Sequence, residues 1–181
     1  MAIHNKSHHN SALQSILKSN KDKRNLKSDV EIKIPDKVNS ILLIEDCLKT
    51  LKRLPDKSVD LILIDPPYNL DLETWDTYTN YIDWASSWIS EAYRVLSDKG
   101  NMIIFGGTQF QDEKSGDLIE LIYYLRHNTK FRLVNTIIWY YKNGMSAHRY
   151  FANRHEEIIW LTKTNKYYFD LDSVRVKYDE K

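Results

Sequence analysis

Residues 60–69 read Asp-Leu-Ile-Leu-Ile-Asp-Pro-Pro-Tyr-Asn, and this stretch indicates both a fold class and a site. Four consecutive aliphatic residues, 61–64, are typical of a strand that is buried on both faces. Pro66 and Pro67 cannot continue a central strand, so the chain must leave the sheet there in an extended shape. In α/β proteins, ligands bind beyond the carboxyl ends of the strands. The stretch therefore predicts a site there, made of a carboxylate, rigid prolines and an aromatic ring.

Strand and helix patterns alternate on both sides of this stretch. Short apolar runs indicate strands, and apolar residues three or four positions apart indicate helices. The expected elements are a strand at 41–44, a brief helix that ends at Pro55, a helix over 79–96, a strand at 102–105, a helix near 116–127, and strands near 132–141 and 156–163. This alternation predicts an α/β fold of three layers around a mostly parallel sheet.

The composition is that of one globular domain with a polar amino-terminal segment. The chain has 181 residues, with 26 Lys and Arg against 25 Asp and Glu. Residues 1–37 hold eight Lys and Arg against four Asp and Glu and few apolar residues, so we expect a flexible basic arm there. Residues 38–181 hold the strand and helix patterns, and we expect them to form the folded region.

Several classes of protein are excluded by what the sequence lacks. No apolar run approaches the roughly 18 residues of a membrane span, and the amino terminus has no apolar core of a secretory signal. Cys47 is the single cysteine, which excludes an intramolecular disulfide and a cysteine-rich zinc site. We therefore expect a cytoplasmic protein that does not bind a membrane.

Positive charge is concentrated in residues 121–155, which contain six Lys and Arg and no carboxylate. A surface that meets a polyanion needs such a stretch, because neutralising phosphates releases counterions. Lys142, Arg149 and Arg154 are the best candidates for phosphate contacts. The alternative is a solvated face whose acidic partners come from elsewhere in the fold.

The tetrapeptide Asp65-Pro66-Pro67-Tyr68 resembles motif IV of the amino-group DNA methyltransferases, and the sequence around it resembles the β class of that family. The resemblance spans roughly 39–178, and the run from Trp139 to Asp172 is similar to small adenine methyltransferases paired with restriction enzymes. The supporting blocks are Asp46 after an apolar run, Leu54-Pro55, Ser58-Val59-Asp60, 135–139 and 154–160. This resemblance implies a Rossmann-like fold and methyl transfer from S-adenosylmethionine to the N6 amine of adenine in double-stranded DNA.

The resemblance also implies roles for the four residues of the motif, which we take as catalytic candidates. Asp65 and the Pro66 carbonyl would accept the two N–H bonds of the amine and aim its lone pair at the sulfonium methyl group. Tyr68 would stack on a base that has left the duplex, and Pro67 would keep the backbone rigid. An Asp in the first position favours adenine, and N4 of cytosine is the alternative target.

Three further residues are candidates beside this motif. Asp46 resembles the acid near the cofactor's adenosine, although a helix N-cap explains it equally well, and Asp65 would also lie near the cofactor. Asn69 and His155 would lie on the nucleic-acid side of the base pocket. A metal site at His155 is rejected, because a helical zinc pair needs a second His where this chain has Ile159.

The chain departs from the β class in one respect. Complete members carry a cofactor loop of the type Asp-Pro-Phe-x-Gly-x-Gly, whereas none of the five glycines here has G-x-G spacing. We therefore expect a truncated or split enzyme with an incomplete sheet and an open strand edge. Its partner would be a complementary carboxyl-terminal fragment or a second copy. The alternative function is an inactive DNA-binding remnant.

Overall fold

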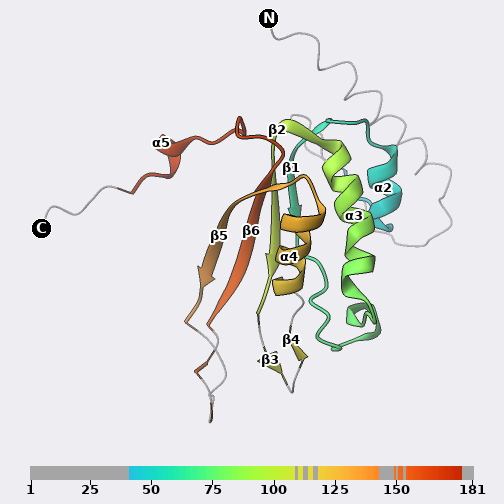
Figure 1. Ribbon diagram of the computed structural model, residues 1–181, viewed down its shortest axis with the longest axis vertical. Helices are drawn as coiled ribbons and strands as arrows, with labels where there is room; N and C mark the ends of the chain where they lie inside the picture. Colours follow the sequence, from blue (N-terminus) through green and yellow to red (C-terminus); the bar gives the residue numbers. More distant parts are fainter. Residues whose placement is uncertain are drawn as a thin grey trace, which may run out of the picture.

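A four-stranded sheet with the strand order β1-β2-β6-β5 forms the centre of the protein (Figure 1). The computed structural model describes residues 41–108, 110–111, 114–115, 118–142, 149, 151–152 and 154–176, so the expected arm over 1–37 lies outside the described residues. The strands are β1 Val59–Ile64, β2 Leu96–Gly106, β3 Phe110–Gln111, β4 Lys114–Ser115, β5 Arg132–Tyr140 and β6 His155–Thr162. The helices are α2 Cys47–Arg53, a 3-10 turn η1 Thr74–Asp76, α3 Tyr81–Val95, α4 Leu118–Asn128 and α5 Leu171–Val174.

The strand directions make the sheet mixed, which corrects the prediction of a mostly parallel sheet. β1 and β2 pair in parallel, whereas β6 pairs antiparallel with both β2 and β5. β2, α4 and β5 form a crossover, and β6 then returns between the two strands. β6 follows β5 through residues 141–154, and no helix is found in the described part of that connection. Consecutive strands joined without a crossover helix pair antiparallel.

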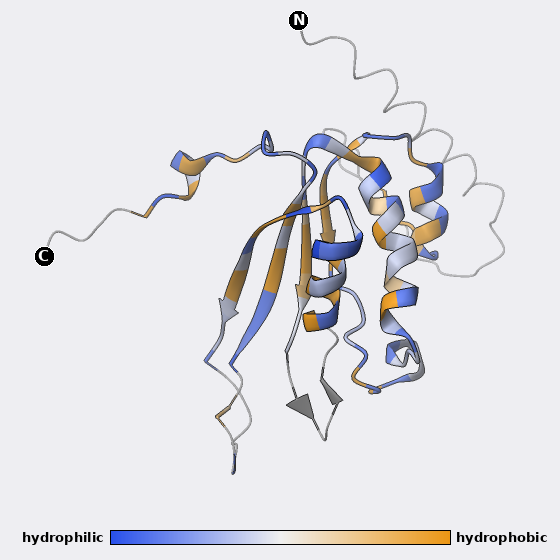
Figure 2. Ribbon diagram, in the orientation of Figure 1, coloured by the Kyte–Doolittle hydropathy of each residue, from blue (hydrophilic) through white to orange (hydrophobic). Residues whose placement is uncertain are grey.

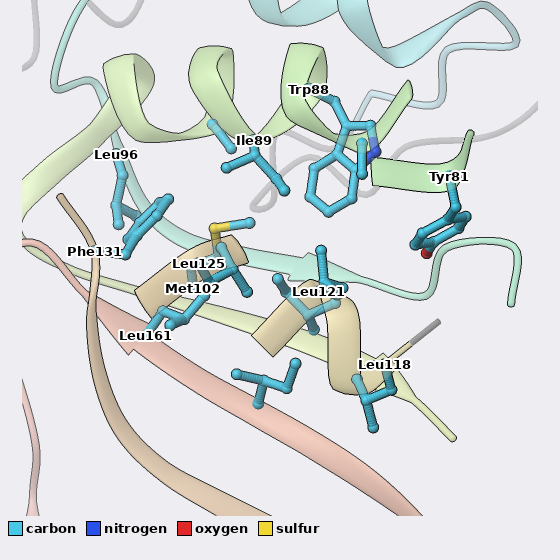
Figure 3. Close-up of a cluster of buried hydrophobic side chains, with 14 residues drawn as sticks. Tyr81, Trp88, Ile89, Leu96, Met102, Leu118, Leu121, Leu125, Phe131 and Leu161 are labelled. Atoms are coloured by element: carbon cyan, nitrogen blue, oxygen red, sulfur yellow. The ribbon is translucent and has the colours of Figure 1, made fainter. Parts of the chain in front are cut away.

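One face of the sheet is covered by α3 and α4. Alternate residues of β2 and β6 point to this face, so Met102, Ile104 and Leu161 are fully buried against the helices. Figure 3 shows Trp88 and Ile89 of α3 pointing toward this layer. Burying a side chain of this size stabilises the fold by roughly 1.5–3 kcal/mol. The helices expected over 79–96 and near 116–127 are confirmed as α3 and α4. Apolar residues recur at helical spacing along both of them.

The opposite face of the sheet is largely exposed. Leu63 of β1 is 63% exposed and Trp139 of β5 is 54% exposed, although both are apolar residues of the sheet. Figure 2 shows the middle of these strands as hydrophobic. The prediction that 61–64 is buried on both faces was therefore wrong, since the helices of the described residues cover only one face of β1. The described residues form two of the three expected layers.

The free edge of β1 marks the other difference from the prediction. β1 stands at the end of the strand order, and no strand of the described residues pairs with its outer edge. Residues 41–44, expected as a strand, have no strand structure, and Ile44 is 90% exposed. A strand forms only where a neighbour accepts its backbone hydrogen bonds, and this run has no such neighbour in the described residues. None of the described helices is long and apolar enough to cross a membrane.

Candidate active site

The Asp-Pro-Pro-Tyr segment leaves the sheet at the carboxyl end of β1, as the sequence predicted. Pro66 is buried, Asp65 is exposed, and Pro67 and Tyr68 are half-buried. β1, β2 and β5 run in the same direction, so their carboxyl ends share one edge of the sheet (the lower edge in Figure 1). The β5–β6 connection begins at this edge. The edge therefore brings the segment close to residues far away in the sequence.

Tyr68 is hydrogen-bonded to the carboxylate of the same segment. Its hydroxyl donates to Asp65 Oδ1 at 3.0 Å. Burial raises the pKa of Tyr68 well above its usual range, and the hydrogen bond to Asp65 and the negative charges of Asp65 and Glu156 raise this pKa further. The hydroxyl therefore remains a donor at neutral pH.

The backbone on either side of Tyr68 is held by buried groups. The Tyr81 hydroxyl, at the start of α3, donates to the Pro67 carbonyl at 2.9 Å. On the other side, the Asn69 amide nitrogen donates to Asp76 Oδ1 at 2.9 Å. The side-chain oxygen of Asn69, a residue predicted to contact nucleic acid, accepts from the Tyr78 amide at 2.7 Å. In this structure the Asn69 side chain therefore shapes the loop.

Two cavities of nearly equal volume meet at the Asp-Pro-Pro segment. Asp65, Pro66 and Pro67 line both of them. The first cavity, of about 580 Å³, is called here the loop cavity, and Tyr68, Leu70, Leu72, Trp75, Asp76 and Glu156 complete its wall. The second, of about 570 Å³, is called the strand cavity, and its wall is completed by Ile41, Leu42, Leu43, Glu45, Cys47, Thr50, Leu51, Ile62, Ile64, Trp84, Trp88 and Ala92. Asp65 can therefore face a different ligand in each cavity.

The wall of the strand cavity has few polar groups. Glu45 forms an ion pair with Arg53 and accepts a hydrogen bond from the Thr50 hydroxyl at 2.9 Å. Asp46, predicted to bind the cofactor or to cap a helix, is the N-cap of α2, and its Oδ1 accepts from the Leu48 amide at 2.8 Å. The helix-cap interpretation is therefore confirmed, and the residues that line the two cavities do not include Asp46.

The start of β6 adds a third carboxylate to the loop cavity, besides those of Asp65 and Asp76. Glu156 lines this cavity, and successive residues of a strand point to opposite faces, so His155 and Glu157 point the other way. His155 Nε2 lies 3.3 Å from Glu157 Oε1, and Glu157 also accepts from the Thr108 hydroxyl at 2.6 Å. Sequence reasoning chose His155 and missed Glu156. Strand alternation was the signal that could have found it.

The three predicted phosphate contacts lie in or beside the β5–β6 connection. Lys142, Arg149 and Arg154 are all exposed. This connection begins at the edge that carries Asp65. The structure thus brings the basic residues and the Asp-Pro-Pro-Tyr segment to one edge. The described part of the chain contains no cluster of three or more side chains that could hold a metal ion.

Comparison with known proteins supports the resemblance to DNA methyltransferases that the sequence indicated. The fold is similar to that of PvuII DNA methyltransferase, a cytosine-N4-specific enzyme, with a TM-score of 0.57 and 19% identity over 72% of this chain and 51% of that one. In sequence, the chain is 35% identical to the type II methyltransferase M.HpaI of Haemophilus parainfluenzae over 142 residues, which are 75% of this chain and 43% of that protein. It is 33% identical to M.BglII of Bacillus subtilis over 141 residues, 75% of this chain and 39% of that protein.

The chain therefore spans less than half the length of these two relatives. The α/β methyltransferase fold expected from the sequence is confirmed. The family described as DNA methylase, which covers N6 and N4 enzymes, matches residues 59–181, from the start of β1 to the last residue. This chain belongs to the N6/N4 DNA methylase family.

Proposed function

We propose that this chain carries the base-binding half of a DNA methyltransferase that transfers a methyl group from S-adenosylmethionine to the N6 amine of adenine. One observation carries the proposal: Asp65, Pro66 and Pro67 line both the loop cavity and the strand cavity. Methyl transfer needs the amine and the methyl donor on opposite sides of one short path. A carboxylate where two cavities meet suits that requirement.

The chemistry of the amine explains the use of Asp65. The lone pair of an adenine amine is delocalised into the ring, so the amine is a poor nucleophile. A carboxylate and the Pro66 carbonyl that accept its two N–H bonds draw the nitrogen toward a tetrahedral shape and direct its lone pair. S-Adenosylmethionine would supply an electrophilic methyl group on sulfur: the N–C bond forms as the S–C bond breaks, S-adenosylhomocysteine leaves, and the methylated amine releases one proton to solvent. Asp65 is exposed, so its oxygens are accessible to an amine that enters the loop cavity.

Tyr68 is suited to hold the base in the loop cavity. Its ring lines this cavity, and its hydroxyl is tied to Asp65 at 3.0 Å. A base that leaves the duplex gains stacking on such a ring, which offsets part of the cost of unstacking from its neighbours. The Asp in the first motif position favours adenine, and N4 of cytosine is the second candidate target, which product analysis distinguishes.

The described residues fit one side of the cofactor only. The strand cavity offers apolar walls, with Ile62 and Trp84 among them, and Asp65 at one end. The ribose and the amino-acid end of S-adenosylmethionine need hydrogen-bonding groups, and Glu45, the acid of this cavity besides Asp65, is already bonded to Arg53 and Thr50. We infer that the missing groups come from another part of the domain.

A second polypeptide that carries this remaining part would also cover exposed apolar surface. The outer edge of β1 has no strand neighbour among the described residues, and Leu61 and Leu63 on its open face are more than half exposed. An open edge beside apolar side chains favours pairing with a further strand. We propose a complementary carboxyl-terminal fragment as this partner, with a second copy of this chain as the alternative.

We propose double-stranded DNA as the substrate. A DNA substrate is also consistent with the cytoplasmic location that we propose. Lys142, Arg149 and Arg154 would contact phosphates, because all three are exposed at or beside the edge that carries Asp65. An inactive DNA-binding remnant remains the second candidate function, favoured by the few polar groups of the strand cavity.

The test is transfer of a tritiated methyl group to unmethylated DNA. The 181-residue chain is assayed alone and after co-expression with the part of M.HpaI that it does not match. We expect counts on DNA only in the second case, and no counts when Asp65→Ala replaces the wild type. Full activity of the isolated, monomeric chain would contradict the need for a partner. Salt-dependent DNA binding with no transfer in either case would support the remnant.

A further inference from the structure

The geometry points to Asp76 as a positioning residue of the loop cavity, an inference that rests on the proposed function of that cavity. Asp76 ends the turn η1, and its side chain is 2% exposed. A carboxylate is rarely buried to this degree unless it is paired or hydrogen-bonded. The partners of this one are backbone amides of the loop that follows the Asp-Pro-Pro-Tyr segment.

One carboxylate receives three backbone N–H groups. Asp76 Oδ1 accepts from the Asn69 amide at 2.9 Å, and Oδ2 accepts from the amides of Leu70 at 3.0 Å and Leu72 at 3.5 Å. The backbone carbonyl of Asp76 accepts a fourth bond, from the Asp71 amide at 3.2 Å. Hydrogen bonds to a charged acceptor are roughly twice as strong as neutral ones. The bonds close the loop on itself around Asp76.

The loop needs this support because its backbone is strained. Asn69 and Asp71 have φ angles of 55° and 59°, in the left-handed region that favours glycine. Each such residue costs of the order of 1 kcal/mol, and the conformation persists only where the surroundings enforce it. The bonds to Asp76 lie at or beside both positions. They therefore offset the strain where it arises.

The consequence for the site is a fixed Tyr68. The residue before it, Pro67, is held by the Tyr81 hydroxyl, and the residue after it, Asn69, is held by Asp76. Leu70 and Leu72, whose amides also bond to Asp76, line the loop cavity. Asp76 does not need to touch the base, since it sets the position of the ring and of the wall that do.

The test is the isosteric variant Asp76→Asn, whose amide retains one acceptor oxygen and presents an NH₂ group to the backbone N–H donors. Steady-state kinetics are measured on the assembly in which wild-type transfer is observed. We expect kcat to fall about 100-fold, as for a misplacement near 1 Å, with the KM for S-adenosylmethionine within about twofold of wild type. The value of kcat is taken per folded enzyme molecule, because a carboxylate that only stabilised the fold would lower the folded fraction and leave kcat per folded molecule unchanged.

The matched control is Asp60→Asn. Asp60 accepts a hydrogen bond from the Ser97 hydroxyl at 2.8 Å at the start of β1, the end of the strand away from Asp65. The substitution therefore makes the same chemical change outside the loop. We expect wild-type kcat and KM for this variant.

Amide hydrogen exchange keeps the inference separate from the proposed function. In the full chain, Asp76→Asn should speed exchange at residues 69, 70 and 72 by about tenfold or more while β2 and α3 keep wild-type protection. Faster exchange in a chain that transfers no methyl group in any assembly would refute the proposed function and keep Asp76 as the anchor of the loop. Unchanged exchange at these three amides, or unchanged kcat in an active assembly, would overturn the inference.

Discussion

The two cavities that meet at Asp65 have nearly the same volume, about 580 and 570 Å³, but the chain builds them in different ways. The wall of the loop cavity comes from one loop and the start of β6, and buried hydrogen bonds to Asp76 and from Tyr81 hold that loop. The wall of the strand cavity comes mostly from apolar side chains of residues 41–43, β1, α2 and α3, beside a strand edge with no described neighbour.

This difference indicates which half of the site the chain specifies by itself. Polar groups of the loop cavity have partners within the described chain, so its shape does not depend on another molecule. Apolar groups of the strand cavity, such as Ile62, pack against the core but still line an open cavity, which a ligand or a further segment would cover. The chain thus encodes the proposed base side of the site and leaves the cofactor side incomplete.

The largest expected effect compares two tryptophans, one from each cavity. Trp88 lines the strand cavity and is 3% exposed, whereas Trp75 lines the loop cavity and is 63% exposed. Trp88→Ala should lower the free energy of unfolding by about 3–5 kcal/mol, because it leaves a hole between α3 and the sheet. Trp75→Ala should change it by less than about 1 kcal/mol.

Urea denaturation of both variants measures this contrast. Equal losses for the two variants would mean that the loop cavity depends on packing as much as the strand cavity does. If Trp88→Ala does not fold, Trp88→Phe, which removes less volume, should still be clearly less stable than Trp75→Ala.

A smaller effect is expected when one hydrogen bond to the loop is removed. Tyr81→Phe deletes the bond to the Pro67 carbonyl and should cost about 1 kcal/mol of stability. It should also lower kcat more than it raises any KM, since the carbonyl that it holds belongs to the Asp-Pro-Pro segment. Tyr78→Phe, in the neighbouring ring, is the matched control. Equal values of kcat and KM for the two variants would show that the Tyr81 hydroxyl has no role in the site.

DNA binding tests whether the edge that carries the loop cavity faces the nucleic acid. Lys142→Ala and Arg154→Ala should each weaken binding and reduce the slope of log K against log salt by about 0.9, because each removes one phosphate contact. Lys57→Ala, at the opposite end of β1, should leave that slope unchanged. Binding titrations between low and moderate salt give the slopes. A slope that responds only to Lys57 would place the DNA elsewhere.

The smallest effect is spectroscopic. Burial and the carboxylates of Asp65 and Glu156 raise the pKa of Tyr68 above its ordinary value of about 10. Because the pKa is raised in the folded state, the protonated Tyr68 contributes to the free energy of unfolding. This contribution is complete below pH 10 and is lost as the pH rises further. The phenolate absorbance of the wild type minus that of Tyr68→Phe should stay near zero at pH 10. A half-complete titration of Tyr68 there would show an open, solvated ring.

Much of the fold could be predicted from periodicity along the chain. The helix expected over 79–96 is α3, Tyr81–Val95, where the Asn80 side chain caps the first turn, and β2 begins directly at Leu96. The strand at 41–44 failed because a strand also needs a neighbour, which local pattern does not provide. The prediction of a mostly parallel sheet was also wrong at β6, because the direction of a strand depends on the connection that precedes it, which local pattern does not provide either.

The site divides in a similar way. The place of Asp65 and Tyr68 followed from two prolines after an aliphatic run, which is local information. Asp76 and Tyr81 were missed because their partners are backbone groups brought close by the turn of the loop. The roles of Asp65 and Tyr68 in the reaction stay predictions.

We propose that Asp65 accepts a hydrogen bond from the N6 amine of adenine during methyl transfer. The most direct measurement uses S-adenosylmethionine with a deuterated methyl group, the assembled enzyme and unmethylated DNA, followed by digestion to nucleosides and mass spectrometry. We expect labelled N6-methyladenine from the wild type and none from Asp65→Ala. Label on cytosine N4, or equal label on adenine with the Asp65→Ala variant, would contradict this role of Asp65.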